Sequence, residues 1–102
     1  MTAEAHIEDA GHGRYLLCGE LSFATVPDLL REGDAVFNGQ GGVTLDLDQV
    51  SRADSAGLAL LVEWVRRARA RSVPLTICNM TPQLQAMAKV AGLDRVLPLK
   101  GG

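Results

Sequence analysis

The sequence predicts an α/β fold: a mostly parallel sheet with helices, preceded by an antiparallel hairpin. Three observations predict this class. The chain has 102 residues, the length of one domain, so residues 1–102 are expected to form a single domain. Strand and helix patterns then alternate, which requires parallel strands joined by right-handed crossovers. Two strand patterns at the start, over 5–8 and 14–21, flank Gly11-His12-Gly13, which is typical of a hairpin turn.

The remaining elements follow from capping residues and periodicity. Thr25-Val26-Pro27-Asp28 has the spacing of a helix start and predicts a helix to about Phe37, which Gly33 weakens and the glycine-rich residues 38–42 end. Apolar residues from Val43 alternate with polar ones, which predicts a strand with one solvated face. The later elements are a helix from Asp54 or Ser55 to about Arg71, a strand over 73–80, a helix from Thr81-Pro82 to Gly92 with Leu93 as its closing apolar contact, and a strand over 96–99.

Composition and charge exclude several classes of function. Apolar residues make up 47% and charged residues 22%, as in ordinary globular proteins. Ten basic and twelve acidic residues give a net charge of -2, which argues against nucleic acid as a partner. No apolar run approaches the roughly 20 residues that span a bilayer, and the first residues do not resemble a signal peptide. We therefore expect a cytoplasmic protein without direct membrane insertion.

The cysteines and histidines do not predict a metal site. Cys18 and Cys78 lack metal-ligand spacing and are interpreted as small core residues with reduced thiols. His6 and His12 are isolated in the sequence. A chain of this length also buries little more than one core, which disfavours a deep catalytic cleft. The sequence predicts no catalytic residue, no metal and no cofactor, and hence no enzyme.

Two further patterns are interpreted as structural. The glycine-rich residues 39–42 lack the Lys-Ser/Thr of a phosphate loop and precede a strand, which is typical of a turn. Asp46, Asp48 and Asp54 could suggest an acidic metal or phosphoaspartate pocket. However, the alternation of the strand places Asp46 and Asp48 on its solvated face.

The junction before the second predicted helix is the best candidate site. In parallel sheets, functional residues gather where the carboxyl ends of strands lead into helices. Asp54 and Ser55 are good N-cap residues, and a helix N-terminus offers free backbone N–H groups and the positive end of the dipole. The plain alternative is that one of these two residues caps the helix and has no other role.

The helical wheel of this segment adds a second observation. The stripe predicted to face the sheet contains Leu58, Leu61, Val62, Val65 and Ala68. Gly57 lies at its edge, where the missing side chain lets helix and sheet approach closely. The opposite face carries Ala56, Ala59, Leu60, Glu63 and Arg67. Three apolar residues on an outer face predict a docking surface for another protein beside an accessible Ser55.

Two other features of this helix are assigned to packing and solvation. Trp64 lies at the margin of the stripe, and packing is favoured over a role as an interface anchor. Arginines gather toward the end of the helix, where cations are favoured, so a solvated face is favoured over a basic patch for lipid headgroups or nucleic acid. These arginines are Arg66, Arg67, Arg69 and Arg71.

Asp54-Ser55-Ala56-Gly57-Leu58, preceded by Leu45-Asp46-Leu47-Asp48-Gln49-Val50, resembles the signature of the STAS domain family. Gly19-Glu20-Leu21 and Gly92-Leu93 extend the resemblance over nearly the whole chain. The resemblance implies a small STAS-like α/β domain that binds protein partners and does not catalyse a reaction. Together with the helical wheel, it predicts a partner-binding site made of Asp54, Ser55, Ala56, Gly57, Ala59, Leu60 and Glu63.

The resemblance leaves two branches of the family open. In anti-sigma-factor antagonists, the anti-sigma factor is a kinase that phosphorylates the serine matching Ser55. In the other branch, the MlaB-type STAS subunit of the Mla phospholipid-transport ABC transporter binds the ATPase subunit and so lies peripheral to the inner membrane. The segments 55–61 and 82–88 look closer to the transporter subunit. Antagonists more often carry Ser or Thr where Ala56 stands, and Gly where Ala59 stands.

In both branches Ser55 is the predicted controlling position. A phosphoryl group adds about 1.5 to 2 negative charges, which a helix N-terminus tolerates and a dry apolar interface does not. Thr25, Asp28 and Leu30 of the preceding helix are predicted neighbours of the interface. A lipid-carrying or ligand-sensing domain is an alternative of another class, but it requires an internal cavity for which a short chain with 4% aromatic residues leaves little room.

Overall fold

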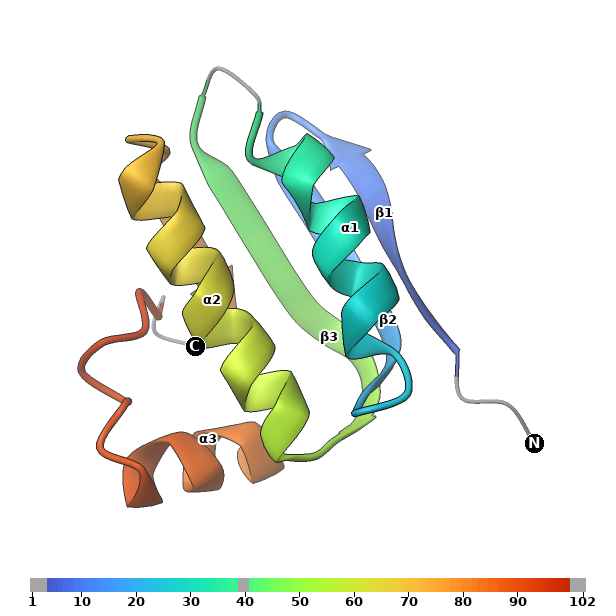
Figure 1. Ribbon diagram of the computed structural model, residues 1–102, viewed down its shortest axis with the longest axis vertical. Coiled ribbons are helices and arrows are strands. Elements are labelled where there is room, and N and C mark those ends of the chain that lie inside the picture. The colour runs from blue at the N-terminus through green and yellow to red at the C-terminus, as the bar shows by residue number, and fades with distance from the viewer. Residues whose placement is uncertain (1–3, 39–40, 100–102) are drawn as a thin grey trace.

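A computed structural model describes residues 4–38 and 41–99 and confirms the α/β class (Figure 1). Helices α1 and α2 lie side by side on one face of the sheet, and α3 lies across the end where α2 begins. No helix in the described part of the chain is long and apolar enough to cross a membrane. The elements are β1 (Ala5–Gly11), β2 (Arg14–Leu21), α1 (Val26–Val36), β3 (Val43–Ala53), α2 (Ser55–Ala70), β4 (Leu75–Cys78) and α3 (Pro82–Val90).

The sheet has the order β1-β2-β3-β4. β1 pairs with β2 antiparallel, and β2–β3 and β3–β4 pair in parallel, so the predicted hairpin and the predicted parallel pairing are both confirmed. The hairpin turn places three successive residues in the left-handed region, with φ of 85° at Gly11, 57° at His12 and 79° at Gly13. Glycine at two of these positions makes the turn possible at little steric cost.

The ends of α3 follow the predicted capping pattern. Thr81 is the N-cap of the helix, and its side-chain oxygen accepts a hydrogen bond from the Leu84 backbone N–H at 3.1 Å. At the other end Gly92 has φ 73°, and the Leu93 N–H donates to the carbonyl of Ala88 at 2.8 Å. This is the Schellman arrangement, in which a left-handed residue satisfies the last helical carbonyls.

The prediction of a last strand over 96–99 is wrong. Residues 94–96 form a turn, and the pairing is reduced to a single bridge between Ile77 and Leu99. The Ile77 N–H donates to the Pro98 carbonyl at 2.9 Å. Because Pro98 has no N–H of its own, it cannot return a bond and extend the ladder.

Trp64 and Gly33 determine how closely the two covering helices pack. Trp64 is 0% exposed, which confirms packing as its role, and its ring lies 6.2 Å from that of Phe37, centroid to centroid. A Cβ atom on Gly33 would lie 2.4 Å from the Trp64 indole nitrogen. Gly33 therefore weakens α1 locally but provides the space that lets α1 and α2 pack together.

Asp46 departs from the prediction of a solvated strand face. It is only 6% exposed, although Asp48 is exposed as expected. Two side chains cover the Asp46 carboxylate: Arg14 donates to its Oδ2, and Asn79 donates to its Oδ1 at 2.9 Å. The Asp48 backbone N–H also donates to Oδ1 at 2.9 Å. The alternation of apolar and polar residues in β3 places Asp46 on the face away from the helices, as predicted. The side chains of Arg14 in β2 and Asn79 after β4 then cover its carboxylate and bury it.

The pKa of Asp46 reflects these contacts. Burial acts to raise the pKa of its carboxyl group, but hydrogen bonds from Asn79, the Asp48 backbone and Arg14 outweigh burial and hold the pKa below its ordinary value. Since the folded pKa is the lower one, the ionised carboxylate stabilises the fold above the unfolded pKa of about 3.9. This contribution is lost as the pH falls through the folded pKa.

We predict that Asp46→Asn lowers the free energy of unfolding at pH 7 by about 1–3 kcal/mol, because Arg14 and the other donors lose a charged acceptor. The difference from the native protein should begin to shrink below about pH 4, where the carboxyl group of the unfolded chain becomes protonated, and should shrink further as the pH falls through the lower pKa of folded Asp46. Urea unfolding at several pH values measures both effects. The exposed Asp48→Asn is the control and should change stability by less than about 0.5 kcal/mol. Equal effects of both variants at pH 7 would contradict the role of Asp46.

Candidate partner-binding site

The candidate site lies where β2 and β3 end, at the lower end of the molecule in Figure 1. These strands pair in parallel through Leu21 and Ala53, so the loops that follow them emerge side by side. The Asp54 N–H donates to the Leu21 carbonyl at 3.0 Å and joins the two loops. The predicted gathering of functional residues at the carboxyl ends of parallel strands therefore has a structural basis here.

Asp54, and not Ser55, caps helix α2. Asp54 is extended, with φ -117° and ψ -169°, and its Oδ1 accepts a hydrogen bond from the Ala56 N–H at 2.8 Å. Ser55 is the first residue of the helix and is exposed. Within the described residues, no hydrogen bond involves the Ser55 hydroxyl. Because the capping role belongs to Asp54, the Ser55 hydroxyl is free to meet an incoming molecule.

Gly57 packs inside the protein and is not a surface residue. A Cβ atom there would lie 2.7 Å from the Leu21 Cβ and 2.9 Å from the Leu21 carbonyl oxygen. The predicted close approach of helix and sheet is thus confirmed, but the assignment of Gly57 to a partner-binding surface is wrong. It supports the site indirectly, because it sets how closely the start of α2 approaches β2.

Leu60 also departs from the predicted docking surface. It is 1% exposed and belongs to the core. Leu60 lies one helical turn before Trp64, on the side of α2 that meets α1. The stripe predicted from the helical wheel includes only the residues that face the sheet. Because α2 also packs against α1, its buried stripe is wider than predicted. The buried residues of α2 are Gly57, Leu58, Leu60, Leu61, Trp64, Val65 and Ala68.

An apolar hollow of about 340 Å³ lies directly beside Ser55. Ala59 is exposed and Ala56 is half-buried, as the docking surface requires. The most exposed large apolar side chain of the hollow is Phe23, at 80%, which sequence analysis missed. We call this surface the Ser55 hollow; it is lined by Phe23, Val26, Pro27, Ser55, Ala56 and Ala59.

The loop between β2 and α1 is held so that Phe23 points outward. The buried Thr25 hydroxyl donates to the Glu20 carbonyl at 2.6 Å and accepts from the Ser22 N–H at 3.0 Å. The Ser22 hydroxyl in turn donates to the Glu20 carboxylate at 2.9 Å. With its polar groups satisfied internally, this loop presents its apolar residue to solvent. The sequence signal for it was a phenylalanine in the short loop between Ser22 and Thr25.

The predicted neighbours on α1 do not line the hollow. Thr25 is buried and serves the loop, and Leu30 is half-buried against the core. Asp28 is exposed and forms an ion pair with Arg31 on its own helix. Helix α1 contributes to the Ser55 hollow through its first turn, by Val26 and Pro27.

Glu63 belongs to an ionic cluster and not to the hollow. Its carboxylate accepts from Arg66 at 2.8 Å and from Arg67 at 2.6 Å, and Arg67 continues to Asp34 of α1 at 2.7 Å. Hydrogen bonds from these two arginines lower the pKa of Glu63 to about 2. Three of these four groups lie on α2, and the cluster connects that helix to α1. Its balanced charge fits the solvated face that was predicted for the arginines.

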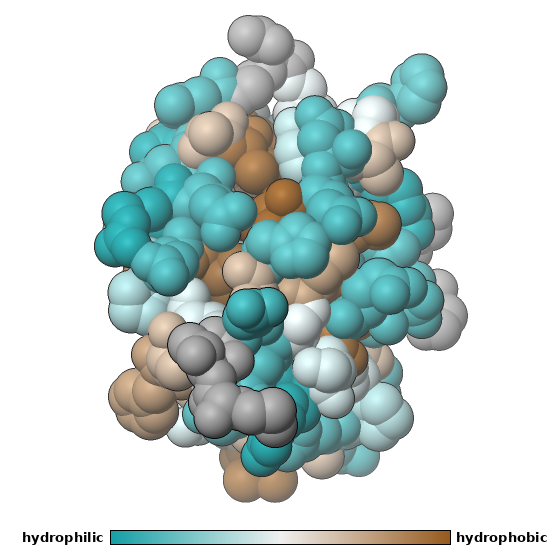
Figure 2. All heavy atoms as spheres, turned by 90° about the vertical axis from the view of Figure 1, so that its right-hand side faces the viewer, coloured by the Kyte–Doolittle hydropathy of each residue, from teal (hydrophilic) through white to brown (hydrophobic). Residues whose placement is uncertain are grey.

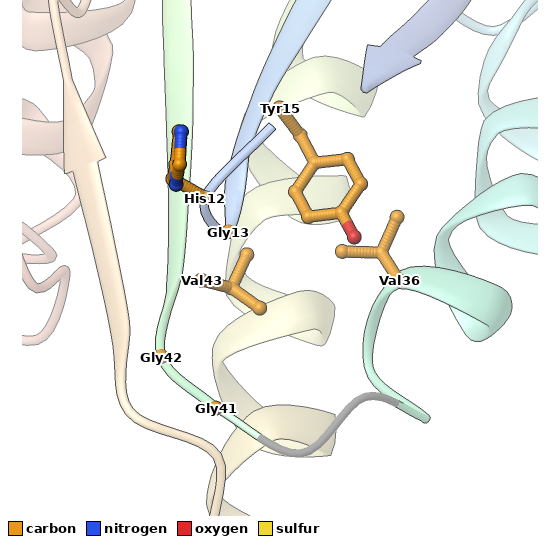
Figure 3. Close-up of a pocket in the computed structure, with 7 residues that line it drawn as sticks. All are labelled: His12, Gly13, Tyr15, Val36, Gly41, Gly42 and Val43. Atoms are coloured by element: carbon orange, nitrogen blue, oxygen red, sulfur yellow. The ribbon is translucent and has the colours of Figure 1, made fainter. Parts of the chain in front are cut away.

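A second hollow, of about 380 Å³, lies at the opposite end of the strands (Figure 3). The Tyr15 ring reaches from β2 toward Val36, and its hydroxyl lies near that side chain. Residues at the hairpin turn and at the start of β3, including Gly13 and Val43, complete the lining. This end holds the amino ends of β2 and β3, where parallel sheets rarely carry their sites.

Comparisons with known proteins agree with the fold. The family model described as "Mlab, STAS domain" matches residues 9–99, and the chain therefore belongs to the STAS domain family. An anti-sigma-B factor antagonist of Listeria monocytogenes is 26% identical over 102 residues, covering 98% of this chain and 89% of the relative.

Solved structures of anti-sigma-factor antagonists share the fold. One from Mycobacterium paratuberculosis has a TM-score of 0.77 at 22% identity and covers 98% of this chain and 86% of that one. The phosphorylated form of the Bacillus cell fate determinant SpoIIAA has a TM-score of 0.69 at 16% identity, with coverage of 96% and 92%. At these identities the structures establish the STAS fold of the chain.

We predict a large stability effect for one apolar residue near the site and almost none for another. Leu60→Ala should lower the free energy of unfolding by about 2–5 kcal/mol, because it leaves a cavity in the core. Phe23→Ala should change it by less than about 0.5 kcal/mol, because the ring is exposed. Denaturant unfolding measures both. A Leu60→Ala variant as stable as the native protein would return Leu60 to the surface and contradict the assignment.

Proposed function

We propose that this chain is a non-catalytic STAS protein that binds a partner protein through the Ser55 hollow, and that phosphorylation of Ser55 controls the binding. This is the role of an anti-sigma-factor antagonist. The observation that carries the proposal is the exposed Ser55 hydroxyl at the start of α2, released from capping by Asp54 and bordered by apolar residues.

The lining of the hollow suits a protein partner. Ala56 and Ala59 are small, so a partner's backbone or side chain can approach the helix closely. Phe23 supplies an exposed aromatic anchor beside them, and large aromatic residues contribute much of the binding energy in protein interfaces. An exposed apolar surface next to polar residues is typical of an interaction site.

A phosphoryl group on Ser55 would make the hollow unfavourable for binding a partner protein. It brings about 1.5 to 2 negative charges to a surface whose other lining residues are apolar. The N-terminus of α2 stabilises negative charge there, so the fold tolerates the modification. A partner that covers the hollow would have to desolvate this charge, and the neighbouring Asp54 carboxylate adds like-charge repulsion.

Relatives support this function over the transporter role. The Listeria relative is named an anti-sigma-B factor antagonist, and a similar structure is that of SpoIIAA in its phosphorylated form. By this analogy the partner is an anti-sigma factor with kinase activity, which phosphorylates Ser55.

A second candidate function has its own support. The matching family model is described by the name Mlab. The family resemblance also implies that antagonists more often carry Ser or Thr where Ala56 stands, and Gly where Ala59 stands. In this alternative the Ser55 hollow binds the ATPase subunit of a phospholipid-transport ABC transporter. The chain would then lie at the cytoplasmic side of the inner membrane through its partner.

We predict that Ala59→Arg weakens partner binding by about tenfold or more, equivalent to about 1.4 kcal/mol, because a charged side chain fills the hollow. Ser55→Asp should weaken binding similarly, while Ser55→Ala should retain it. Isothermal titration calorimetry measures the affinities. Ala70→Arg is the matched control, because Ala70 is exposed on the same helix but lies outside the hollow. Equal loss of binding for Ala59→Arg and Ala70→Arg would contradict the location of the interface.

Two assays with partners from the same organism separate the two functions. Incubation with an anti-sigma factor kinase and ATP should place one phosphate on Ser55, detected by mass spectrometry and absent from Ser55→Ala. A pull-down with a transporter ATPase subunit should be negative. A negative kinase assay combined with a stable ATPase complex would overturn the antagonist function in favour of the transporter subunit.

A further inference from the structure

The hairpin brings together three side chains that are scattered in the sequence. His6 of β1 lies directly opposite Cys18 of β2 in the antiparallel register. Glu8 lies two residues after His6 and so projects from the same face of the strand. One ligand atom from each residue lies within 4.8 Å of the other two. The interpretation of His6 as an isolated histidine is therefore wrong.

These three residues lie on the face of the sheet that α1 and α2 leave open. The neighbouring Leu17 faces the helices and is fully buried, so Cys18 projects to the other side. His6 and Glu8 are exposed, and Cys18 is half-buried rather than part of the core. Figure 2 looks at the side where β1 lies and shows hydrophilic residues around a smaller apolar strip. The exposure of His6 and Glu8 leaves their side chains accessible to ions in solution.

The chemistry of the three groups is that of a zinc site. An imidazole nitrogen, a thiolate and a carboxylate are the ligands that Zn²⁺ accepts in proteins, and three protein ligands leave a fourth position for water. Zinc–ligand bonds of about 2.0–2.3 Å separate tetrahedral ligands by roughly 3.3–3.8 Å. The His6 Nε2 and Glu8 Oε1 are already 2.9 Å apart, and both side chains are exposed and can turn to adjust.

We propose that His6, Glu8 and Cys18 form a binding site for one Zn²⁺ ion. The ion would join the edge strand β1 to β2 from the open face of the sheet. This site uses none of the residues that line the Ser55 hollow, and it does not depend on the proposed function. A bound ion stabilises the folded chain, because the unfolded chain does not hold the three ligands together.

Cys78 provides the matched control for Cys18. It is also free and half-buried, and it lies opposite the carboxylate-bearing Asp46 in the β3–β4 pair. Its sulfur, however, lies 3.9 Å from the guanidinium of Arg14, whose positive charge opposes a metal cation. Among the described residues, the group able to hold a metal contains Cys18 and not Cys78.

The experiment uses the full chain with its affinity tag removed and its thiols reduced. Co²⁺ is the spectroscopic probe, because a thiolate ligand gives a sulfur-to-cobalt charge-transfer band in the near ultraviolet. We expect one Co²⁺ per chain, displaced by one Zn²⁺, and a higher Tm in the presence of Zn²⁺. Cys18→Ser should abolish the band, and His6→Ala should weaken Zn²⁺ binding by at least about tenfold. Cys78→Ser should retain the band and the affinity.

Two results would overturn the site. One is the absence of stoichiometric Zn²⁺ binding to the native chain; the other is a thiolate band that survives in Cys18→Ser or disappears in Cys78→Ser. His6 is exposed, so His6→Ala tests the site even where Cys18→Ser disturbs the half-buried position. Circular dichroism of each variant without metal confirms that the fold is retained. Partner binding through the Ser55 hollow is measured separately and should be unchanged in His6→Ala.

Discussion

The close approach of helix α2 to the end of β2 is the constraint on which the candidate site depends. Gly57 lies against Leu21 with no room for a side chain, and the Asp54 N–H donates to the Leu21 carbonyl. The start of α2 is thus held by backbone contacts and by the Asp54 cap. The Gly57 contact and the Asp54 cap hold the start of α2 without using the Ser55 side chain. Ser55, the first residue of the helix, therefore stays at the surface.

The surface beside Ser55 is assembled from two loops that only the parallel pairing of β2 and β3 brings together. One supplies the start of α2, and the other holds Phe23 outward through the Thr25 hydrogen bonds. The structures that share this fold do so at 16–22% identity. Because one fold is shared at such low identities, the fold by itself does not identify a partner.

The two faces of the sheet meet different physical demands. On one face α1 and α2 bury apolar residues, with Trp64 and Gly33 setting their spacing. The other face, in the described part of the chain, has no helix over it. On this face Arg14 and Asn79 cover the Asp46 carboxylate and donate hydrogen bonds to it. The same open face brings side chains of different strands close together, as with His6 of β1 and Cys18 of β2.

The sequence by itself determined the features that depend on neighbours along the chain. Capping residues and periodicity predicted the order of the helices and of the first four strands and a helix start at Asp54 or Ser55, because turns, caps and helical faces are local. The burial of Leu60, the cover over Asp46 and the meeting of His6 with Cys18 were decided by the tertiary structure. Each of these three features depends on which helices and strands pack together and in which register. The contacts that decide them come from residues far apart in the sequence, so the local pattern does not reveal them.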